Sequence, residues 1–141
     1  MKAIITNDVK NSISGYECIP VLFGNINLKD IPDNALEEIL AIDFLDYIPA
    51  DKVDEYLSNL CKKMRINSTL ILRGHELGLL CRNTINNNIT SQDFNKLIGE
   101  VKSIHKVPDI INLLKSKNLL INNVTIKGIQ YEISAVRQMQ N

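Results

Sequence analysis

The spacing of hydrophobic and polar positions changes along the chain, and each change predicts a secondary-structure element. Apolar residues are nearly continuous from Ile39 to Leu45, the pattern of a parallel strand covered on both faces. From Ala50 the apolar positions recur with a helical period, and charged residues occupy the other side of the predicted helix. These apolar positions are Val53, Tyr56, Leu57, Leu60, Cys61 and Met64. A second buried strand, Ser68 to Gly74, follows, so the whole segment predicts a right-handed parallel crossover.

Weaker patterns on either side predict the remaining elements. Residues 2–6 read "KAIIT" and predict a short first strand. The run "YECIPVLFGNI" is interrupted by Pro20, which lacks a backbone donor and therefore predicts an edge strand or two short strands. Three further helices are predicted; the second begins at Thr90 with Asp93 three residues on, and the third carries Pro108 in its first turn. The stretch "NVTIKGIQYEISAVR" alternates around a Lys-Gly pair and predicts a C-terminal hairpin.

Composition narrows the classes of function without selecting one. The 16 basic and 16 acidic residues of the 141-residue chain cancel, so the basic surface of a nucleic-acid-binding protein is not predicted. No window approaches the roughly 18 apolar residues that span a bilayer, and the N-terminus lacks the apolar core of a signal peptide. Neither a membrane nor a nucleic-acid partner is expected. Abundant Asn, Ile and Lys are typical of an AT-rich genome, such as that of a phage, an intracellular bacterium or a marine microbe.

The cysteines and histidines indicate a cytoplasmic protein without a metal. Cys18, Cys61 and Cys81 are odd in number and form no C-x-x-C pair, which suits small buried thiols in a reducing compartment. We expect Cys61 and Cys81 in the core. His75 and His105 are far apart in the sequence and supply no ligand cluster, so no zinc site is predicted.

From about Gly24 to Arg137 the chain resembles the later part of a class I S-adenosylmethionine-dependent methyltransferase domain, of the compact type found in phage and surface-polysaccharide gene clusters. Four segments carry this resemblance. "GNINLKDIPDNALEEILA" is similar to the segment after the family's third strand, and "DFLDYIPADKVDEYLSNLCKKM" resembles the fourth strand with its motif loop and helix. "STLILRGHEL" is similar to the fifth strand, and "VPDIINLLKSKNLLINNVTIKGIQYEISAVR" resembles the last helix and the closing antiparallel pair.

The resemblance implies a fold class, a domain organisation and a cofactor. The fold would be α/β: a truncated Rossmann-like methyltransferase fold, with a mostly parallel sheet, flanking helices and a C-terminal antiparallel hairpin. Residues 1–141 would form a single domain, in which residues 1–25 hold reduced first strands and residues 26–141 run from the fourth strand to the hairpin. The cofactor would be S-adenosylmethionine if the protein is active.

The chain departs from the family pattern where the family binds its cofactor. The family cradles the cofactor on a glycine-rich loop after the first strand, where a Cβ would stand in the way. Here Thr6, Asn7 and Asp8 occupy that place, and no two of the six glycines form a G-x-G. Too few residues separate the first strand from Cys18 for the usual first helix and second strand. Pro20 stands where the family has its ribose-binding carboxylate.

The departures from the family pattern further along the chain are milder. Asn25 stands where an acidic residue is usual after the third strand, although an amide oxygen can also accept a hydrogen bond from adenine. Asp46 and Tyr47 replace the family's Glu-His in the fourth-strand loop, which removes an imidazole that could act as a base. Asn67 and Ser68 replace a glycine pair before the fifth strand.

Six residues are candidates for a site at the carboxyl ends of the strands, where open α/β sheets bind ligands. The cofactor contacts would be Asn7, Asn25, Asp43 and Tyr47, and the further candidates are Asp46 and His75. Structural roles are open for the last four: Asp43 bonding a loop amide, Tyr47 covering the helix start, Asp46 capping a turn, and His75 as a solvated loop residue. No Ser-His-Asp order, phosphate loop or Gly-x-Ser-x-Gly elbow is present.

These observations favour a methyltransferase-like protein that has lost catalysis and works as a binding, assembly or regulatory module. A shortened first unit would uncover a sheet edge or face, so a homo-oligomer or a protein partner is expected. The alternative is a minimal active methyltransferase acting on a small molecule or saccharide, with a site completed by a second subunit. A third possibility is a viral inhibitor or decoy that binds a host enzyme.

Overall fold

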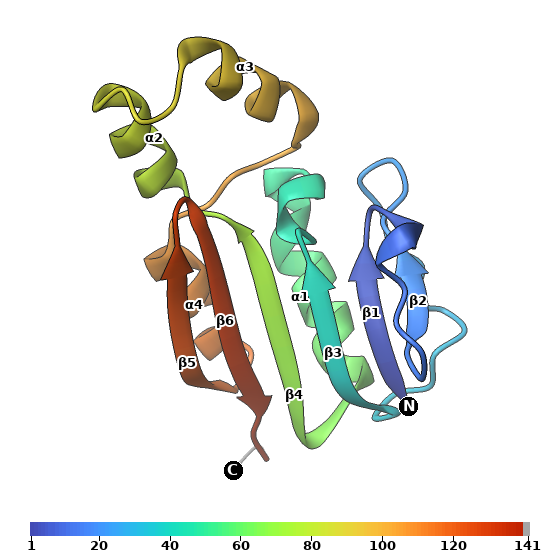
Figure 1. Cartoon of the computed structure of the whole chain (residues 1–141). Coiled ribbons are helices and arrows are strands. Elements are labelled where there is room, and N and C mark those ends of the chain that lie inside the picture. The colour runs from blue at the N-terminus through green and yellow to red at the C-terminus, as the bar shows by residue number, and fades with distance from the viewer. Residues whose placement is uncertain (140–141) are drawn as a thin grey trace.

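The computed structural model describes residues 1–139, which form one six-stranded sheet in the order β2-β1-β3-β4-β6-β5. The strands are β1 (Lys2–Thr6), β2 (Glu17–Pro20), β3 (Leu36–Ile42), β4 (Met64–His75), β5 (Leu119–Lys127) and β6 (Gln130–Arg137). The first four strands are parallel to one another, and β6 and β5 close the sheet as an antiparallel hairpin (Figure 1). The predicted α/β class, the mostly parallel sheet and the C-terminal hairpin are therefore confirmed.

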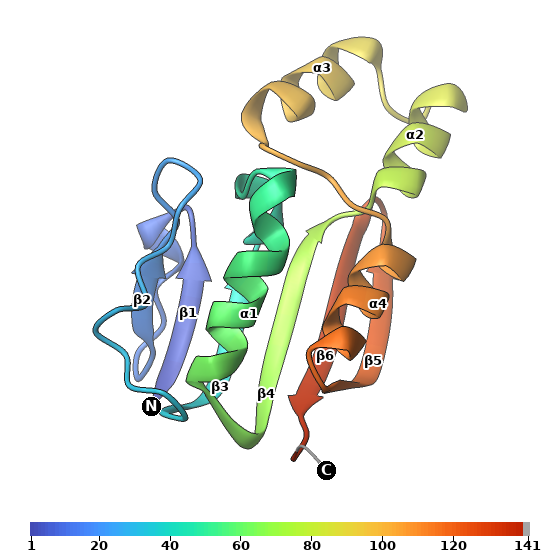
Figure 2. The same ribbon diagram turned by 180° about the vertical axis from the view of Figure 1, so that it is seen from behind.

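Two helices cover one face of the sheet, and the core lies beneath them. The helices of the chain are α1 (Val53–Lys63), α2 (Leu77–Ile85), α3 (Ser91–Glu100) and α4 (Val107–Ser116). Figure 2 shows α1 and α4 side by side on the same face. The predicted apolar stripe of α1 is confirmed, because Leu57 and Leu60 are fully buried. On the strands beneath, alternate residues such as Ile39, Leu72 and Ile133 complete the core.

The opposite face carries no α-helix among residues 1–139, and we call it the helix-free face. Its residues alternate with those of the core along β1, β3, β4 and β6. They are Lys2, Ile4, Thr6, Glu38, Leu40, Ile42, Thr69, Ile71, Arg73, Glu132, Ser134 and Val136. In Figure 1 the connection between β1 and β2 passes in front of these two strands, while the rest of the face is bare of ribbon.

That connection, residues 7–16, contains a single 3-10 turn, η1 (Val9–Asn11), in place of an α-helix. The register of β2 on β1 is nevertheless that of a regular parallel pair, in which Ala3 lies opposite Glu17 and Thr6 opposite Pro20. β2 ends at Pro20 and lies at the edge of the sheet, as its sequence predicts.

Two predictions about buried segments need correction. The predicted strand over Ile39–Leu45 begins earlier and ends at Ile42, because Asp43 has a positive φ of 54° and turns the chain out of the sheet. The apolar residues that follow belong to η2 (Leu45–Tyr47) and fill the core from a turn. Cys81 is exposed on α2, so the expectation that it lies in the core is wrong, whereas Cys61 is buried as predicted.

The helices α2 and α3 stand beyond the carboxyl ends of the strands (Figure 1). Glu76 fixes the entrance to α2, because its carboxylate accepts from the backbone N–H of Leu79 at 3.0 Å and from that of Val107, at the start of α4, at 2.6 Å. The predicted cap of α3 is present, since the Thr90 hydroxyl accepts from the N–H of Asp93. None of the four α-helices, nor any other helix of residues 1–139, is long and apolar enough to cross a membrane.

Candidate functional site

The carboxyl ends of β3 and β4 lie side by side and place three titratable side chains together. The backbone N–H of Asp43 donates to the carbonyl of Arg73 at 2.9 Å, which carries the β3–β4 ladder one step past the end of β3. Asp46 follows in η2 (Leu45–Tyr47), and His75 is the last residue of β4. One potential ligand atom from each of Asp43, Asp46 and His75 lies within 4.8 Å of the other two.

Asp46 and His75 form a buried pair that joins the two strand ends. The Nδ1 atom of His75 lies 2.6 Å from Asp46 Oδ2, and the backbone N–H of His75 also donates to this carboxylate. Only 1% of Asp46 is exposed. The structural role predicted for Asp46, the cap of a turn before the helix, is wrong: neither η2 nor η3 (Ala50–Lys52) has a side-chain cap, and the carboxylate reaches across to β4 instead. Its hydrogen bond raises the pKa of His75 above the usual value.

Asp43 is half-buried and shares the negative environment of Asp46. Burial raises the pKa of Asp43, and the charge of Asp46 raises it further. The positive φ at Asp43 is uncommon outside glycine and is the kind of backbone strain that concentrates at functional sites. Two carboxylates thus lie close together, with one imidazole to balance them.

Tyr131 borders the same place from β6. It is 2% exposed, and its hydroxyl has no hydrogen-bond partner among the described residues. A Cβ added to Gly74 would lie 2.6 Å from this hydroxyl and 2.9 Å from Asp46 Oδ1, so both groups face the space that the glycine leaves. Burial raises the pKa of Tyr131, with a further increase from the charges of Asp46 and Asp43. Sequence reasoning missed Tyr131, because its alternation marked it only as a core residue of the hairpin.

The end of β1 has a different character, because its polar groups bond one another. The buried hydroxyl of Thr6 accepts from the backbone N–H of Asp8 at 3.1 Å and from the side-chain amide of Asn11 at 3.1 Å. The backbone N–H of Lys10 donates to the Asp8 carboxylate at 3.0 Å, and that of Asn11 donates to the Asp8 carbonyl at 3.0 Å. The backbone donors at Asp8, Lys10 and Asn11 are thus all engaged within the loop.

Tyr47 and Asn7 approach each other between these two strand ends. Burial raises the pKa of Tyr47, the charge of Asp43 raises it further, and the nearby side chain of Asn7 opposes both effects. The structure therefore brings Asn7, Asp43, Asp46, Tyr47 and His75 to one edge of the sheet. Tyr47 is half-buried, and Asn7 is exposed.

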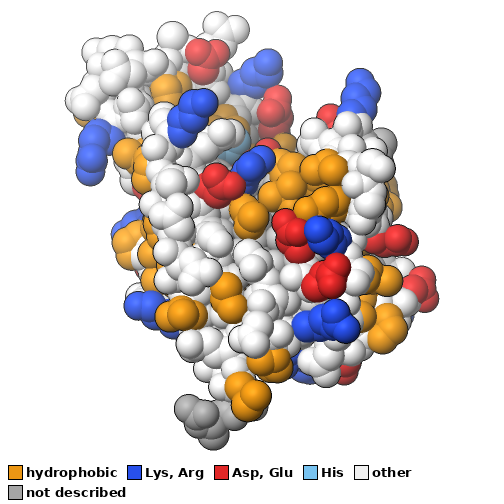
Figure 3. Space-filling view, turned by 60° about the horizontal axis from the view of Figure 1, so that its bottom comes forward, with side chains coloured by type: hydrophobic (Ala, Val, Ile, Leu, Met, Phe, Trp, Pro, Cys, Tyr) orange, Lys and Arg blue, Asp and Glu red, His pale blue; other side chains and the backbone are white. Residues whose placement is uncertain are grey.

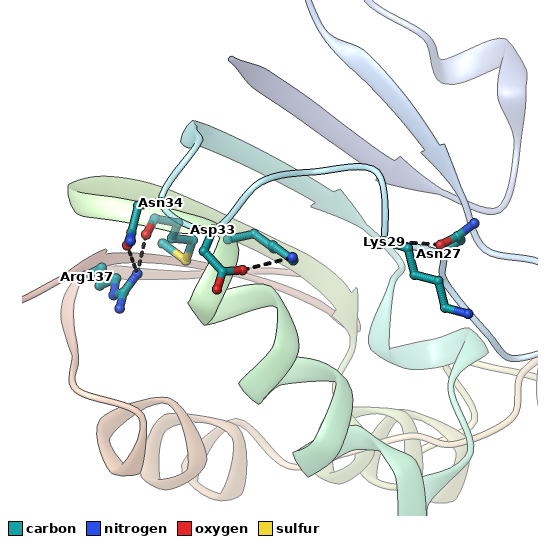
Figure 4. Close-up of polar contacts among 7 residues, drawn as sticks. Asn27, Lys29, Asp33, Asn34 and Arg137 are labelled. Carbon is teal, nitrogen blue, oxygen red and sulfur yellow. Dashed lines mark hydrogen bonds and ion pairs between the residues drawn. The ribbon is translucent and has the colours of Figure 1, made fainter.

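Asn25, the remaining candidate, does not lie with them. Its side-chain oxygen accepts from the Tyr56 hydroxyl on α1 at 2.8 Å, which ties the loop before β3 to the helix-covered side of the sheet. Asn25 lines an open cavity of about 660 Å³ between this loop and α1, together with Asn27, Lys29, Asp33 and Lys63 among others. Figure 4 shows how that loop is held, with Lys63 paired to Asp33 at 2.9 Å and Arg137 donating to Asn34 at 2.9 Å.

Comparison with solved structures identifies the fold. A methyltransferase from Methanosarcina mazei matches with a TM-score of 0.66 at 11% identity, over 96% of this chain and 81% of that protein. An O-methyltransferase family protein from Burkholderia thailandensis matches with a TM-score of 0.63 at 11% identity, over 89% of this chain. This chain spans 37% of the length of that Burkholderia protein. The chain has the Rossmann-like α/β fold of class I methyltransferases.

A third structure of this fold contains a cofactor product. It is the 1,6-didemethyltoxoflavin-N1-methyltransferase of Burkholderia thailandensis with bound S-adenosylhomocysteine, which matches with a TM-score of 0.55 at 11% identity, over 77% of this chain and 46% of that protein. No protein-family model matches the amino-acid sequence, and neither does any curated protein. The methyltransferase likeness is therefore one of fold.

Proposed function

We propose that this protein is a methyltransferase-like module that no longer binds S-adenosylmethionine and acts in protein assembly through its helix-free face. The observation that carries the first half is the end of β1. There the backbone N–H groups of Asp8, Lys10 and Asn11 are all bonded within their own loop. A nucleoside cofactor would have to displace these bonds, and the side chains at these positions keep the main chain from approaching it closely.

The helix-free face supports the second half of the proposal. Its centre is apolar, with half-buried Leu40, Ile42, Ile71 and Val136 on three adjacent strands. Figure 3, a view from the lower side of this face, shows hydrophobic side chains gathered between charged ones. These side chains are only partly exposed, but they are contiguous, and contiguous apolar surface is a feature of interaction sites.

A second copy of this chain is the partner that the charges of the face fit. Lys2 pairs with Glu38 at 3.4 Å on β1 and β3, and Arg73 pairs with Glu132 at 3.1 Å on β4 and β6. The sheet register puts the two ion pairs at opposite corners of the apolar centre. Two copies can be related by a two-fold axis that lies in the plane of the face, perpendicular to the line between the two ion pairs. This axis places the Lys2–Glu38 pair of one copy against the Arg73–Glu132 pair of the other. Sheets that pack with crossed strands adopt such arrangements.

Titration calorimetry with S-adenosylmethionine tests the first half of the proposal. We expect no saturable binding at cofactor concentrations up to about 1 mM, a range that micromolar cofactor sites saturate easily. Micromolar binding that Asp43→Ala removes would contradict it.

Light scattering with matched variants tests the second half. Ile71→Lys places a charge in the centre of the face and should convert a dimer to a monomer, because a buried unpaired charge is costly. Ile98→Lys on α3, away from the face, is the control and should leave the dimer intact. A monomeric wild-type protein at high concentration would contradict self-association.

The alternative function is a minimal active methyltransferase whose pocket a second subunit completes. The observation that favours it is the grouping of Asn7, Tyr47 and Asp43 at the sheet edge where open α/β folds bind ligands. Under this alternative the acceptor is a small molecule or saccharide, and cofactor binding depends on dimer formation. Binding by the wild type that Ile71→Lys abolishes would select it over the first proposal.

A further inference from the structure

The side chains at the ends of β3 and β4 supply a set of metal ligands that the proposed assembly function does not use. Asp43 and Asp46 contribute carboxylate oxygens and His75 an imidazole nitrogen, all within 4.8 Å of one another. Asp43 and His75 are partly exposed, so an ion has a route to them, while Asp46 is buried behind them.

The charged groups around Asp43, Asp46 and His75 are mainly negative. Asp43 and Asp46 lie beside the one imidazole of His75, and the charge of Glu100 also acts on it. The nearby cation Arg73 is engaged with Glu132 at 3.1 Å on the helix-free face. Carboxylates gathered in this way repel one another, and a bound cation relieves the repulsion.

A second feature is independent of the charges and also points to a missing partner. The hydroxyl of Tyr131 is buried without a hydrogen bond among the described residues, and it faces the same space beside Gly74 as Asp46 Oδ1. An orphaned buried hydroxyl calls for an explanation such as a water or an ion. A water molecule bound to a cation at Asp46 would lie near the Tyr131 hydroxyl and would be such a partner.

We propose that Asp43, Asp46 and His75 form a binding site for one divalent transition-metal ion, with Zn²⁺, Mn²⁺ and Co²⁺ as the fitting class. One imidazole with two carboxylates suits these ions better than Ca²⁺ or Mg²⁺, which prefer oxygen ligands alone. Three protein ligands leave at least one coordination position open to water or a ligand. This inference does not depend on whether the protein binds S-adenosylmethionine.

Binding requires a small rearrangement of the Asp46–His75 pair. The two atoms now lie 2.6 Å apart, bridged by a hydrogen bond. Two ligands of one ion at about 2.1 Å from it stand roughly 3 Å apart or more. The ring of His75 is partly exposed and can move outward by the difference, whereas Asp46 is fixed by burial.

Calorimetric titration of the untagged protein with ZnCl₂ and MnCl₂ tests the site. We expect one ion per chain, with a dissociation constant at or below about 10 μM for Zn²⁺. Asp43→Asn and His75→Gln should each weaken binding by about tenfold or more. Asp51→Asn removes a carboxylate outside the cluster and should leave the affinity unchanged.

A second measurement covers the case in which a variant fails to fold. Sub-stoichiometric Mn²⁺ added to the wild-type protein should broaden the NMR signals of the His75 ring and the Asp43 amide before that of the Asp33 amide, which precedes β3 at the other end of the sheet. Absence of saturable binding up to about 1 mM would overturn the proposal. So would binding that Asp43→Asn and His75→Gln leave unchanged, or broadening that reaches Asp33 before Asp43 and His75.

Discussion

Two of the parallel strand pairs of this protein, β1–β2 and β3–β4, are joined by connections of different kinds. Between β3 and β4 the chain forms α1, which buries Leu57 and Leu60 against the sheet. Between β1 and β2 it forms only a loop with one 3-10 turn, and Ile13 in that loop is largely exposed. The β3–β4 connection therefore creates a helix-covered core, whereas the β1–β2 connection leaves the face it crosses without an α-helix.

The strand ends differ in the same sense. At the end of β1 the polar groups of residues 6–11 satisfy one another, and little remains to bind a ligand. At the ends of β3 and β4 the polar groups of two strands lie together. There Asp43 has a positive φ, and the Tyr131 hydroxyl has no hydrogen-bond partner among the described residues. The comparison teaches that the two ends of one sheet differ in what they leave free: the end of β1 is closed by its own hydrogen bonds, whereas the ends of β3 and β4 gather groups that suit a ligand.

Replacing one apolar residue by alanine in each of the two connections should give the largest difference in the free energy of unfolding. Leu57→Ala removes a fully buried side chain from α1 and should lower the free energy of unfolding by about 3 kcal/mol. Ile13→Ala in the β1–β2 connection should change it by no more than about 0.5 kcal/mol. Urea denaturation measures both. Equal losses would mean that the loop crossover packs as tightly as the helix.

A methyl group at the end of β4 should be the next most costly change. Gly74→Ala puts a Cβ 2.6 Å from the Tyr131 hydroxyl and should destabilise the fold by about 2 kcal/mol. Adding Tyr131→Phe removes the clashing oxygen and should recover part of that loss, which a double-mutant cycle on thermal stability measures. Full tolerance of Gly74→Ala would show that the strand ends are not closely packed.

Loss of one hydroxyl tests the closed loop at the end of β1. Thr6→Val preserves shape but removes the oxygen that accepts from Asp8 and Asn11, and should cost about 1–2 kcal/mol of unfolding free energy. Thr125→Val on the exposed face of β5 is the control, with an expected change below about 0.5 kcal/mol. Chemical denaturation that finds the two variants equally stable would refute a loop held by its own hydrogen bonds.

The pH dependence of the Asp46–His75 pair should be the smallest effect. The pKa of His75 is raised in the folded state from its usual 6.5, so its stabilising contribution is complete below that pH. It is lost as the pH rises through the folded pKa. The stability difference between wild type and His75→Gln, measured in EDTA, should therefore shrink between pH 6 and pH 9. A difference that grows with pH would have the wrong sign.

Much of this fold follows from local sequence patterns. The helical period from Val53 predicts α1, Pro20 predicts the edge position of β2, and the alternation around Lys127 predicts the hairpin. Each of these signals acts over a few residues, so the sequence alone reveals it. The resemblance to methyltransferases added the mostly parallel sheet with flanking helices, and the match to solved methyltransferases supports this fold.

The candidate site was less accessible to prediction, because its contacts join residues far apart in the chain. The local sequence favours Asp46 as the cap of a turn before the helix, yet its carboxylate bonds His75, 29 residues on. Tyr131 meets the same site from the hairpin, and its unpaired hydroxyl leaves no mark in the alternation of β6. No metal site is predicted from the sequence, because its cysteines and histidines show no ligand spacing. Asp43 and Asp46 are separated from His75 by α1 and most of β4.

The most direct test of the central claim is the response of the backbone amides at the end of β1 to S-adenosylmethionine. In a ¹⁵N-resolved NMR titration, the amide signals of Asp8, Lys10 and Asn11 should stay unchanged at millimolar cofactor, because their N–H groups remain bonded within the loop. Saturating shifts of these three signals at micromolar cofactor would contradict the account.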